Sequence, residues 1–384
     1  MNDSWLFKIT KRFDIFKTNV KGRREDQMIK LPEIGKISAE VFNDLIYPHL
    51  GAENKSVLVG PQHGVDVGIV EIGNKAVAMT SDPVFIVPEY GFKRAAWFAT
   101  HILASDVVTS GLSPTYLCID LNLPLSMTEE ELTIVWETVD GECKKMGMAV
   151  VCGHTARYDN CFYPMVGGAT VLAVGEIDKY VSPKFARLGD KIIITKGPAI
   201  EASGIFAAMF PKLLAKKFGE KFALEAQTLF YKMSVVEDAL TAVTIGVRDD
   251  GVSAMHDATE CGIWGGLFEI AQAAGLGARI EKDKIVFEDC VSEICELFGI
   301  DPYKSISEGT LLITCRENKA EQLVDVLRNK NLKSSIVGEL TEPKCGMILV
   351  EDGKEKELEH PRVDPFWKAF YDARQDYQKL EIES

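Results

Sequence analysis

The sequence lacks a long apolar run, since no stretch reaches the roughly 20 residues that a membrane-spanning helix needs. It also lacks a Gly-x-x-x-x-Gly-Lys-Ser/Thr loop, a strand-linked Gly-x-Gly-x-x-Gly motif and the protein-kinase loop set, which disfavours the common NTPase, dinucleotide-binding and protein-kinase folds. Basic residues are few: 43 Lys and Arg stand against 57 Asp and Glu, giving a net charge of -14. Such a chain would repel a nucleic-acid backbone. We expect a cytoplasmic protein with neither a nucleic-acid nor a membrane partner.

Cysteine pairs with metal-binding spacing are also missing. The nine cysteines are odd in number, scattered and never spaced Cys-x-x-Cys, which argues against a disulfide framework and a structural zinc site. Cys152-x-His154 is followed by Cys161, but this spacing does not suit tetrahedral zinc. We expect reduced thiols, mostly in the core.

A length of 384 residues favours two domains. Hydrophobic periodicity lapses at 178–191, so the boundary is placed there. The expected organisation is an N-terminal extension over 1–30, domains over 31–177 and 178–351, and a C-terminal tail or helix over 352–384. The extension is locally basic and carries an apolar stripe at helical spacing, which indicates a docked helix or, alternatively, an organelle transit peptide.

Strands and helices alternate along both expected domains, which predicts an α+β fold built of α/β layers. In the first, strands are expected near 55–59, 67–72, 75–81, 115–121, 148–152 and 166–175, and helices near 93–110 and 128–146. In the second, strands are expected near 191–195, 252–256, 310–315, 334–340 and 346–351, and helices near 199–217, 221–231, 234–246, 261–274 and 318–330. Trp367, Phe370 and Tyr371 predict a terminal helix.

Three aspartates lie beside apolar elements. Asp66 and Asp82 stand at strand edges, and Asp106 falls on the apolar stripe of the helix at 93–110. An inward carboxylate costs several kcal/mol, by order of magnitude, unless it is hydrogen-bonded, paired or bound to metal. A local bond from Asp106 to the turn at 109–111 is one solution. Convergence of the three acids on magnesium, a hard ion that takes oxygen ligands and often serves ATP, is the other.

Two further segments could carry chemistry. "VVCGHTARYDN" ends a predicted strand at Gly153 and presents His154, which could be a general acid or base, a phosphate contact or only a turn residue. "MHDATECGIWGG" places Asp257 and Thr259 before a glycine-rich helix start. That helix N-terminus could bind an anion, or the two residues could merely cap it.

With these pieces in order, residues 31–350 resemble the ATP-dependent superfamily of aminoimidazole ribonucleotide (AIR) synthetase, the hydrogenase maturation factor HypE, thiamine-monophosphate kinase and selenophosphate synthetase. The resemblance rests on seven motifs in sequence order, which are "VDVGIV", "TSDPV", "SDVVTSGLSP", "CGHT", "GDKIIITKG", "MHDATECGIWGG" and "SEGTLLI". The HypE-like, AIR-synthase-related branch is the most similar.

The resemblance implies an N-terminal sheet domain that pairs in a homodimer, a C-terminal α/β domain, and ATP with Mg²⁺ between them. Carried over by position, it implies metal ligation by three acids, catalytic roles for two residues, and nucleotide contacts by the same three acids and five further residues. The implied metal ligands are Asp66, Asp82 and Asp106, the catalytic residues are His154 and Asp257, and the cofactor-binding residues are Gly64, Asp66, Ser81, Asp82, Asp106, Gly153, Thr155 and Thr259.

Two departures from the family pattern bear on activity. Val65 stands where a second acid is usual, which predicts a weaker metal site. HypE proteins carry their substrate group on a C-terminal cysteine, whereas this sequence ends "KLEIES" and its last cysteine is Cys345, so self-carried thiocyanate formation is not expected.

The leading hypothesis is an ATP- and magnesium-dependent enzyme that phosphorylates, and so activates, an amide or carbonyl oxygen of a small molecule or carried group. A small-molecule kinase resembling thiamine-monophosphate kinase is the first alternative. A non-catalytic nucleotide-binding partner in assembly or maturation is the second.

Overall fold

The computed structural model describes residue 37 and residues 39–382. The chain divides into two compact units, Met1–Glu53 and Asn54–Ser384. In the first unit, a short helical segment runs from α2 (Ala39–Val41) through a π-helical turn at Phe42–Ile46. The predicted extension over 1–30, with its apolar stripe, lies outside the described residues.

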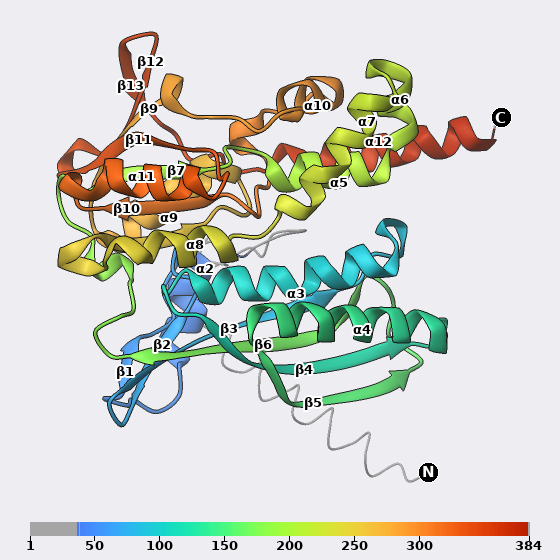
Figure 1. Cartoon of the computed structure of the whole chain (residues 1–384), viewed down its shortest axis with the longest axis horizontal. Helices are drawn as coiled ribbons and strands as arrows, with labels where there is room; N and C mark the ends of the chain where they lie inside the picture. The colour runs from blue at the N-terminus through green and yellow to red at the C-terminus, as the bar shows by residue number, and fades with distance from the viewer. Residues whose placement is uncertain (1–36, 38, 383–384) are drawn as a thin grey trace, which may run out of the picture. The chain divides into compact units, whose positions relative to one another are not determined.

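A six-stranded sheet opens the second unit (Figure 1). Its strands, in the order β1-β2-β3-β6-β4-β5, are antiparallel except for the parallel pair β4–β5. Helices α3 and α4 lie along one face of this sheet. The elements are β1 (Val57–Val59), β2 (Gly68–Ile72), β3 (Lys75–Phe85), α3 (Phe92–Val108), β4 (Pro114–Pro124), α4 (Glu129–Met146), β5 (Ala149–Tyr158) and β6 (Met165–Glu176).

A seven-stranded sheet follows, in the order β13-β12-β9-β11-β7-β10-β8. Only its pair β9–β12 is parallel. The strands are β7 (Lys191–Thr195), β8 (Val252–Asp257), β9 (Gly277–Glu281), β10 (Leu311–Cys315), β11 (Ser334–Thr341), β12 (Met347–Glu351) and β13 (Lys354–Glu357). The helices are α5 (Ile200–Met209), α6 (Pro211–Phe218), α7 (Glu220–Ala226), α8 (Val236–Ala242), α9 (Gly262–Ala274), α10 (Val291–Phe298), α11 (Ala320–Asn329) and α12 (Pro365–Ile382).

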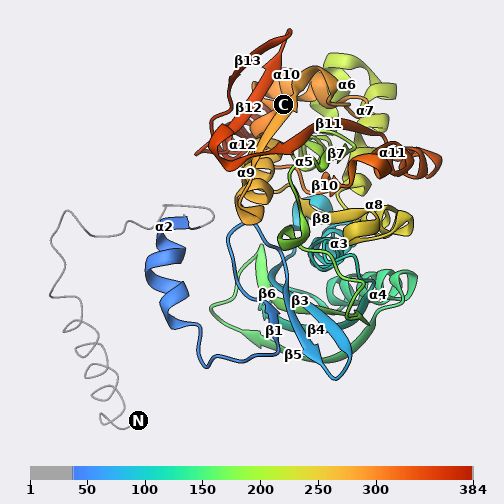
Figure 2. The ribbon, with the colours of Figure 1, turned by 90° about the vertical axis from the view of Figure 1, so that its left-hand side faces the viewer.

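Helix α3 lies between the two sheets, as Figure 2 shows, because it packs on β3 and β6 with one side and on α8 and β8 with the other. Contact on both sides explains why buried residues are spread around more of α3 than one apolar stripe would cover. Ala95, Ala96, Ala104 and Ser105 are all buried, and together they extend around more than one face of the helix. Small residues allow the flanking elements to approach closely on both sides.

The other predicted elements are largely confirmed, with three corrections. The predicted helix 199–217 is broken into α5 and α6 at Pro211, which lacks the N–H needed to continue the first helix. The strand predicted to end at Gly153 continues to Tyr158, because it pairs in parallel with β4 along its whole length. Strands β9 and β13 and helix α10 were not predicted, and β13 lies in the segment predicted as a tail or helix.

The predicted start of α4 and the predicted C-terminal helix are both confirmed, the second with a different buried residue. Thr128 and Glu131 form the expected capping box at the start of α4, with hydrogen bonds of 2.8 and 3.2 Å. The terminal helix α12 exists, but its buried anchor is Phe366, while Trp367 and Tyr371 are exposed. Among the described residues, no helix combines the length and the apolar character needed to cross a membrane.

Candidate active site

A chain of three side chains, of which His256 and Glu269 are buried and Asp66 is partly buried, links the loop before β2 to the second sheet. The Asp66 carboxylate accepts a hydrogen bond from Nδ1 of His256, on β8, at 2.8 to 2.9 Å. The other ring nitrogen, Nε2, donates to Glu269 of α9 at 2.8 Å. Burial lowers the pKa of His256, but the charge of Asp66 and the two hydrogen bonds outweigh it and raise that pKa well above its ordinary value. His256 is therefore a cation that holds Asp66 in place.

The loop that carries Asp66 is seated against α9 by a glycine. Gly64 has φ +77°, and a Cβ built there would lie 2.5 Å from the backbone oxygen of Glu269. Both the backbone conformation and the close approach require glycine at this position. Gly64, implied above as a cofactor-binding residue, thus has a structural reason to be glycine.

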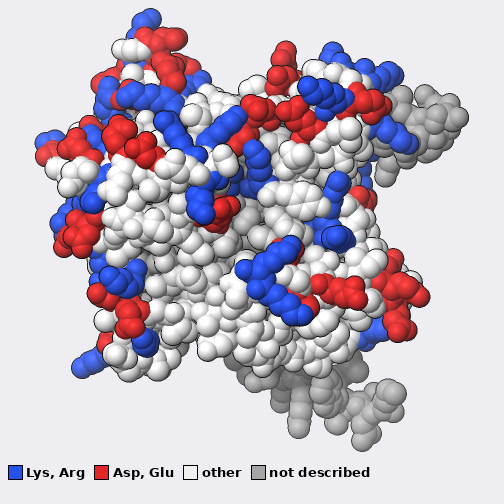
Figure 3. Space-filling model, viewed as in Figure 1, with Lys and Arg blue, Asp and Glu red and all other residues white. Residues whose placement is uncertain are grey.

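Asp257 and Glu308 are buried carboxyls whose oxygens have no hydrogen-bond partner among the described residues. Asp257 ends β8 and is 1% exposed, and Glu308 lies in the loop before β10 and is 2% exposed. Desolvation, with the nearby charge of Asp66, raises the pKa of Asp257 to about 7, although His256 opposes this rise. Desolvation and the charge of Asp257 raise the pKa of Glu308 well above its ordinary value. On the face of the molecule that Figure 3 shows, basic side chains are interspersed with acidic ones.

Asp106 joins the same group from α3. Its Oδ2 accepts a hydrogen bond from Thr80 at 2.8 Å, while Thr109, proposed above as its local partner, bonds its backbone oxygen instead. Desolvation, the charge of Asp257 and contact with Asp82 raise the pKa of Asp106 well above its ordinary range. The charge of Asp66 also contributes to this shift. The structure therefore brings Asp66, Asp82, Asp106 and Asp257 within electrostatic reach of one another.

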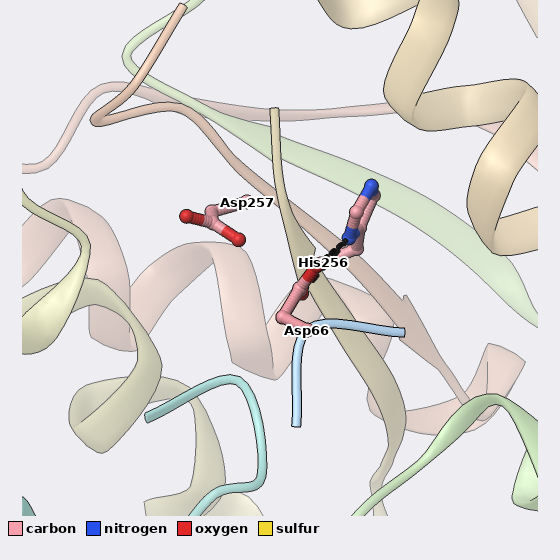
Figure 4. Close-up of side chains that lie close together, drawn as sticks. All are labelled: Asp66, His256 and Asp257. Carbon is pink, nitrogen blue, oxygen red and sulfur yellow. Dashed lines mark hydrogen bonds and ion pairs between the residues drawn. The ribbon is translucent and has the colours of Figure 1, made fainter. Parts of the chain in front are cut away.

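These acids suit a hard cation. Asp66, His256 and Asp257 each offer a ligand atom, and these atoms lie within 4.8 Å of one another (Figure 4). Both nitrogens of His256 already bond carboxylates, so carboxylate oxygens rather than the imidazole are the available donors. Buried carboxylates without partners are costly unless a cation compensates them, and oxygen donors are those that Mg²⁺ prefers. The residues present fit such an ion.

Family models match most of this architecture. The model "AIR synthase related protein, N-terminal domain" matches residues 64–176, and the corresponding C-terminal domain model matches residues 187–350. This chain belongs to the AIR synthase-related family. The two matched segments hold the two sheets, so the predicted two-domain AIR-synthetase-like fold is confirmed.

Known proteins are similar to this chain over most of its length. Carbamoyl dehydratase HypE of Escherichia coli is 26% identical over 267 residues, covering 68% of this chain and 75% of that protein. A crystal structure of a HypE–HypF complex matches with TM-score 0.64 and 20% identity, covering 84% of this chain and 98% of the other. A structure of ThiL complexed with AMPPCP and TMP matches with TM-score 0.64 and 22% identity, covering 86% and 97%.

Four residues implied as nucleotide neighbours lie apart from the acids in this AIR synthase-related chain. Ser81 is adjacent to Asp82 on β3 but bonds Thr170 Oγ1 at 2.9 Å, because successive strand residues point to opposite faces. Gly153, His154 and Thr155 lie exposed on the edge strand β5, where His154 Nε2 bonds the Tyr158 hydroxyl at 3.2 Å. Their roles stay predictions.

Thr259 lies between Asp257 and α9. Its backbone oxygen accepts hydrogen bonds from the N–H groups of Gly262 and Ser307. Neither the Thr259 nor the Asp257 side chain caps α9, so the capping alternative is wrong. Thr259 instead ties the loop after β8 to the loop that carries Glu308.

Sequence reasoning missed His256, Glu269, Glu308 and Glu201 as parts of this site. Glu201, at the start of α5, accepts a hydrogen bond from the Glu308 backbone N–H at 3.1 Å, and desolvation raises its pKa to about 8. His256 and Glu308 lie inside the motifs "MHDATEC" and "SEGTLLI". The signal available in the sequence was an ionisable residue within a strand or a tight turn. Glu269 offered none, since one acid on a helix is ordinarily exposed.

Proposed function

We propose that this protein is an ATP- and Mg²⁺-dependent enzyme of the HypE type, which phosphorylates, and so activates, an amide or carbonyl oxygen of a small molecule or a carried group. The observation that supports it most is the convergence of Asp66, Asp82, Asp106 and Asp257, with both Asp257 oxygens buried and unpartnered. A nucleotide is supported by the ThiL fold, solved with the ATP analogue AMPPCP. The dehydratase type is supported by the similarity to E. coli HypE.

Mg²⁺ supplies charge neutralisation at phosphate oxygens when it is bound, and it would be held by Asp66, Asp82 and Asp106. His256 orients Asp66, and Thr80 orients Asp106, so two of the acids are fixed before any ligand arrives. Such preorganisation reduces the reordering that binding requires.

Proton transfer falls to Asp257 in this proposal. A carboxyl with a pKa of about 7 changes its protonation state close to neutral pH, so an Asp257 oxygen is suited to take a proton from a substrate N–H or O–H group. His154 remains a second proposed catalytic residue, which would act on a group bound beside β5.

Nucleotide binding and turnover test this proposal. Calorimetry with AMPPCP and Mg²⁺ should show saturable binding, and incubation with ATP and candidate amides should release free phosphate. Asp82→Asn and Asp106→Asn should abolish turnover while folding persists, whereas Asp325→Asn, at an exposed site on α11, should not. An absence of nucleotide binding at millimolar concentration would end the proposal.

A small-molecule kinase is the second candidate, because the ThiL structure with TMP shares this fold. The two candidates differ in where the phosphoryl group ends. A stable phosphorylated product would favour the kinase, and free phosphate would favour activation. If both aspartate variants kept nucleotide binding and the wild type had no turnover, a non-catalytic partner would be the better assignment.

We also propose that the protein acts in the cytoplasm as a homodimer and engages a maturation-protein partner. The sheet face away from α3 and α4 supports pairing, because Tyr116 and Val174 are apolar and about two-fifths exposed there. The partner is supported by the likeness to HypE, which has been solved together with HypF. Analytical ultracentrifugation of the full chain, alone and with a candidate partner, measures both associations.

A further inference from the structure

The segment that precedes α12 is bonded to the loop that follows Asp257. Asp364, the residue before α12, is 9% exposed. Its Oδ2 accepts a hydrogen bond from the backbone N–H of Cys261, 103 residues earlier, at 2.8 Å. Its Oδ1 accepts another from the N–H of Phe366 at 2.9 Å, and the Cys261 thiol donates to the Pro361 oxygen at 3.5 Å. The part of the chain predicted as a tail or helix therefore contacts the candidate site.

The backbone at the start of α9 explains why a remote partner is needed there. Cys261 and Gly262 both have left-handed backbone conformations, with φ +62° and +59°. A residue with a Cβ holds this conformation only where the surrounding contacts determine it. A Cβ built on Gly262 would lie 2.5 Å from the backbone oxygen of Ser305, so the start of α9 also packs closely on the loop that carries Glu308. The bond to Asp364 is therefore made at a strained turn between two loops of the site.

The Asp364 carboxylate interacts with both of these loops. Desolvation raises the pKa of Asp364 to about 6, and the charge of Glu260 adds to this rise. Hydrogen bonds from backbone N–H groups oppose it, and one of these groups belongs to Ile306, two residues before Glu308. One carboxylate thus joins the two loops that hold the unpartnered carboxyls of Asp257 and Glu308.

An anion does lie at the N-terminus of α9, and it belongs to the chain itself. A nucleotide phosphate at the Cys261 N–H would have to displace the Asp364 carboxylate. The segment is anchored beyond Asp364 as well, because Phe366 is 1% exposed within a hydrophobic core. Further along α12, Arg374 pairs with Glu89, in the turn before α3, at 2.6 Å. These contacts hold Asp364 at the start of α9 from both sides.

We propose that Asp364 is a positioning residue of the candidate active site, which fixes the loops that carry Asp257 and Glu308 and so sets the separation of these two buried carboxyls. The inference rests on the proposed function, because it concerns the geometry of the same site. Mg²⁺ requires near-ideal octahedral geometry, so an acid that moves with its loop binds the ion less well. Residues that orient metal ligands in this way typically change metal affinity about 10- to 100-fold when they are replaced.

The test compares Asp364→Ala with the wild type as full-length proteins. Hydrogen exchange followed by mass spectrometry, without metal or nucleotide, should be faster in segments 258–262 and 305–310 of the variant and unchanged in α4. Calorimetry with Mg²⁺ and AMPPCP should show about 10-fold weaker binding. Formate should restore both properties, because it can occupy the space of the lost carboxylate and accept the same N–H bonds, whereas chloride at equal ionic strength should not.

Thr128→Ala is the matched control, because it also removes a side chain that bonds backbone N–H at a helix start, but on α4. It should lower the stability of the fold and leave the AMPPCP affinity and the exchange of both segments unchanged. Asp364→Asn keeps the shape of the side chain and one acceptor oxygen, so it should show a smaller loss of affinity. It supplies the same comparison if Asp364→Ala does not fold.

The inference is overturned if the folded Asp364 variant exchanges both segments at the wild-type rate, if it binds AMPPCP with Mg²⁺ as tightly as the wild type, or if Thr128→Ala weakens binding equally. An absence of AMPPCP binding by the wild type would instead end the proposed function. The exchange measurement, which is made without nucleotide, would still decide whether Asp364 fixes the two loops, so the two failures are distinguishable.

Discussion

Replacing Asp257 with asparagine removes a buried ionisable group with almost no change of shape. The carboxyl has a pKa of about 7 in the folded chain against an ordinary value of 3.8. Since the folded state binds more protons between these values, the stability of the wild type falls as pH rises through this window. A shift of about three pKa units corresponds to roughly 4 kcal/mol, of which about 2.5 kcal/mol falls between pH 5 and pH 8.

Asp257→Asn should therefore lose less stability than the wild type between pH 5 and pH 8, by about 2.5 kcal/mol of unfolding free energy. Urea denaturation in EDTA at the two pH values measures the difference. The variant should be more stable than the wild type at pH 8 without metal.

Asp325→Asn is the control, because Asp325 is exposed on α11 and its replacement should leave the pH dependence of the wild type unchanged. If Asp257→Asn and the wild type showed the same pH dependence, the carboxyl would be ionised in the folded state without penalty. The reasoning from burial and from the charge of Asp66 would then be refuted.

Three further substitutions probe the support of the site and the fold. His256→Gln removes the cation that holds Asp66 and should weaken Mg²⁺-dependent AMPPCP binding about 10- to 100-fold by calorimetry. Gly64→Ala should destabilise the fold by about 1 to 3 kcal/mol, seen as a lower thermal midpoint, because Gly64 has a positive φ and its Cβ would approach a backbone oxygen to 2.5 Å. Gly73→Ala, also at positive φ but in open space, should lower the midpoint less. Phe366→Ala should cost about 3 to 5 kcal/mol in urea denaturation, whereas Trp367→Ala, at an exposed neighbour, should cost under about 1 kcal/mol.

Helices and strands were predicted well where the residues that determine them lie close together in the sequence. Thr128 and Glu131 are three residues apart and cap α4 without help from the remainder of the chain. The same holds for Pro211, whose effect on the helix was overlooked although its chemistry is local. Strand β5 differs, because its length depends on pairing with β4, which a linear pattern does not contain.

The candidate site divides in the same way into residues that the sequence identified and partners that only the folded chain brings to them. Asp66, Asp82 and Asp106 were identified as a candidate cation site because each is a carboxylate beside apolar residues, and their order along the chain resembled a family pattern. Their partners were not accessible in this way. His256 is separated from Asp66 by 190 residues, so the chain's folding alone makes them neighbours.

The sequence by itself determined the layer type of the fold, the acids that stand beside apolar elements and the family to which the chain belongs, because composition, periodicity and motif order are properties of the linear chain. Only the tertiary structure decided which acids lack partners, which side chain holds Asp66 and which carboxylate binds the start of α9. The physical reason is that burial, electrostatic coupling and strand register arise between residues that are remote in sequence, and a carboxyl such as Asp257 acquires its raised pKa only when the surrounding elements exclude water from it.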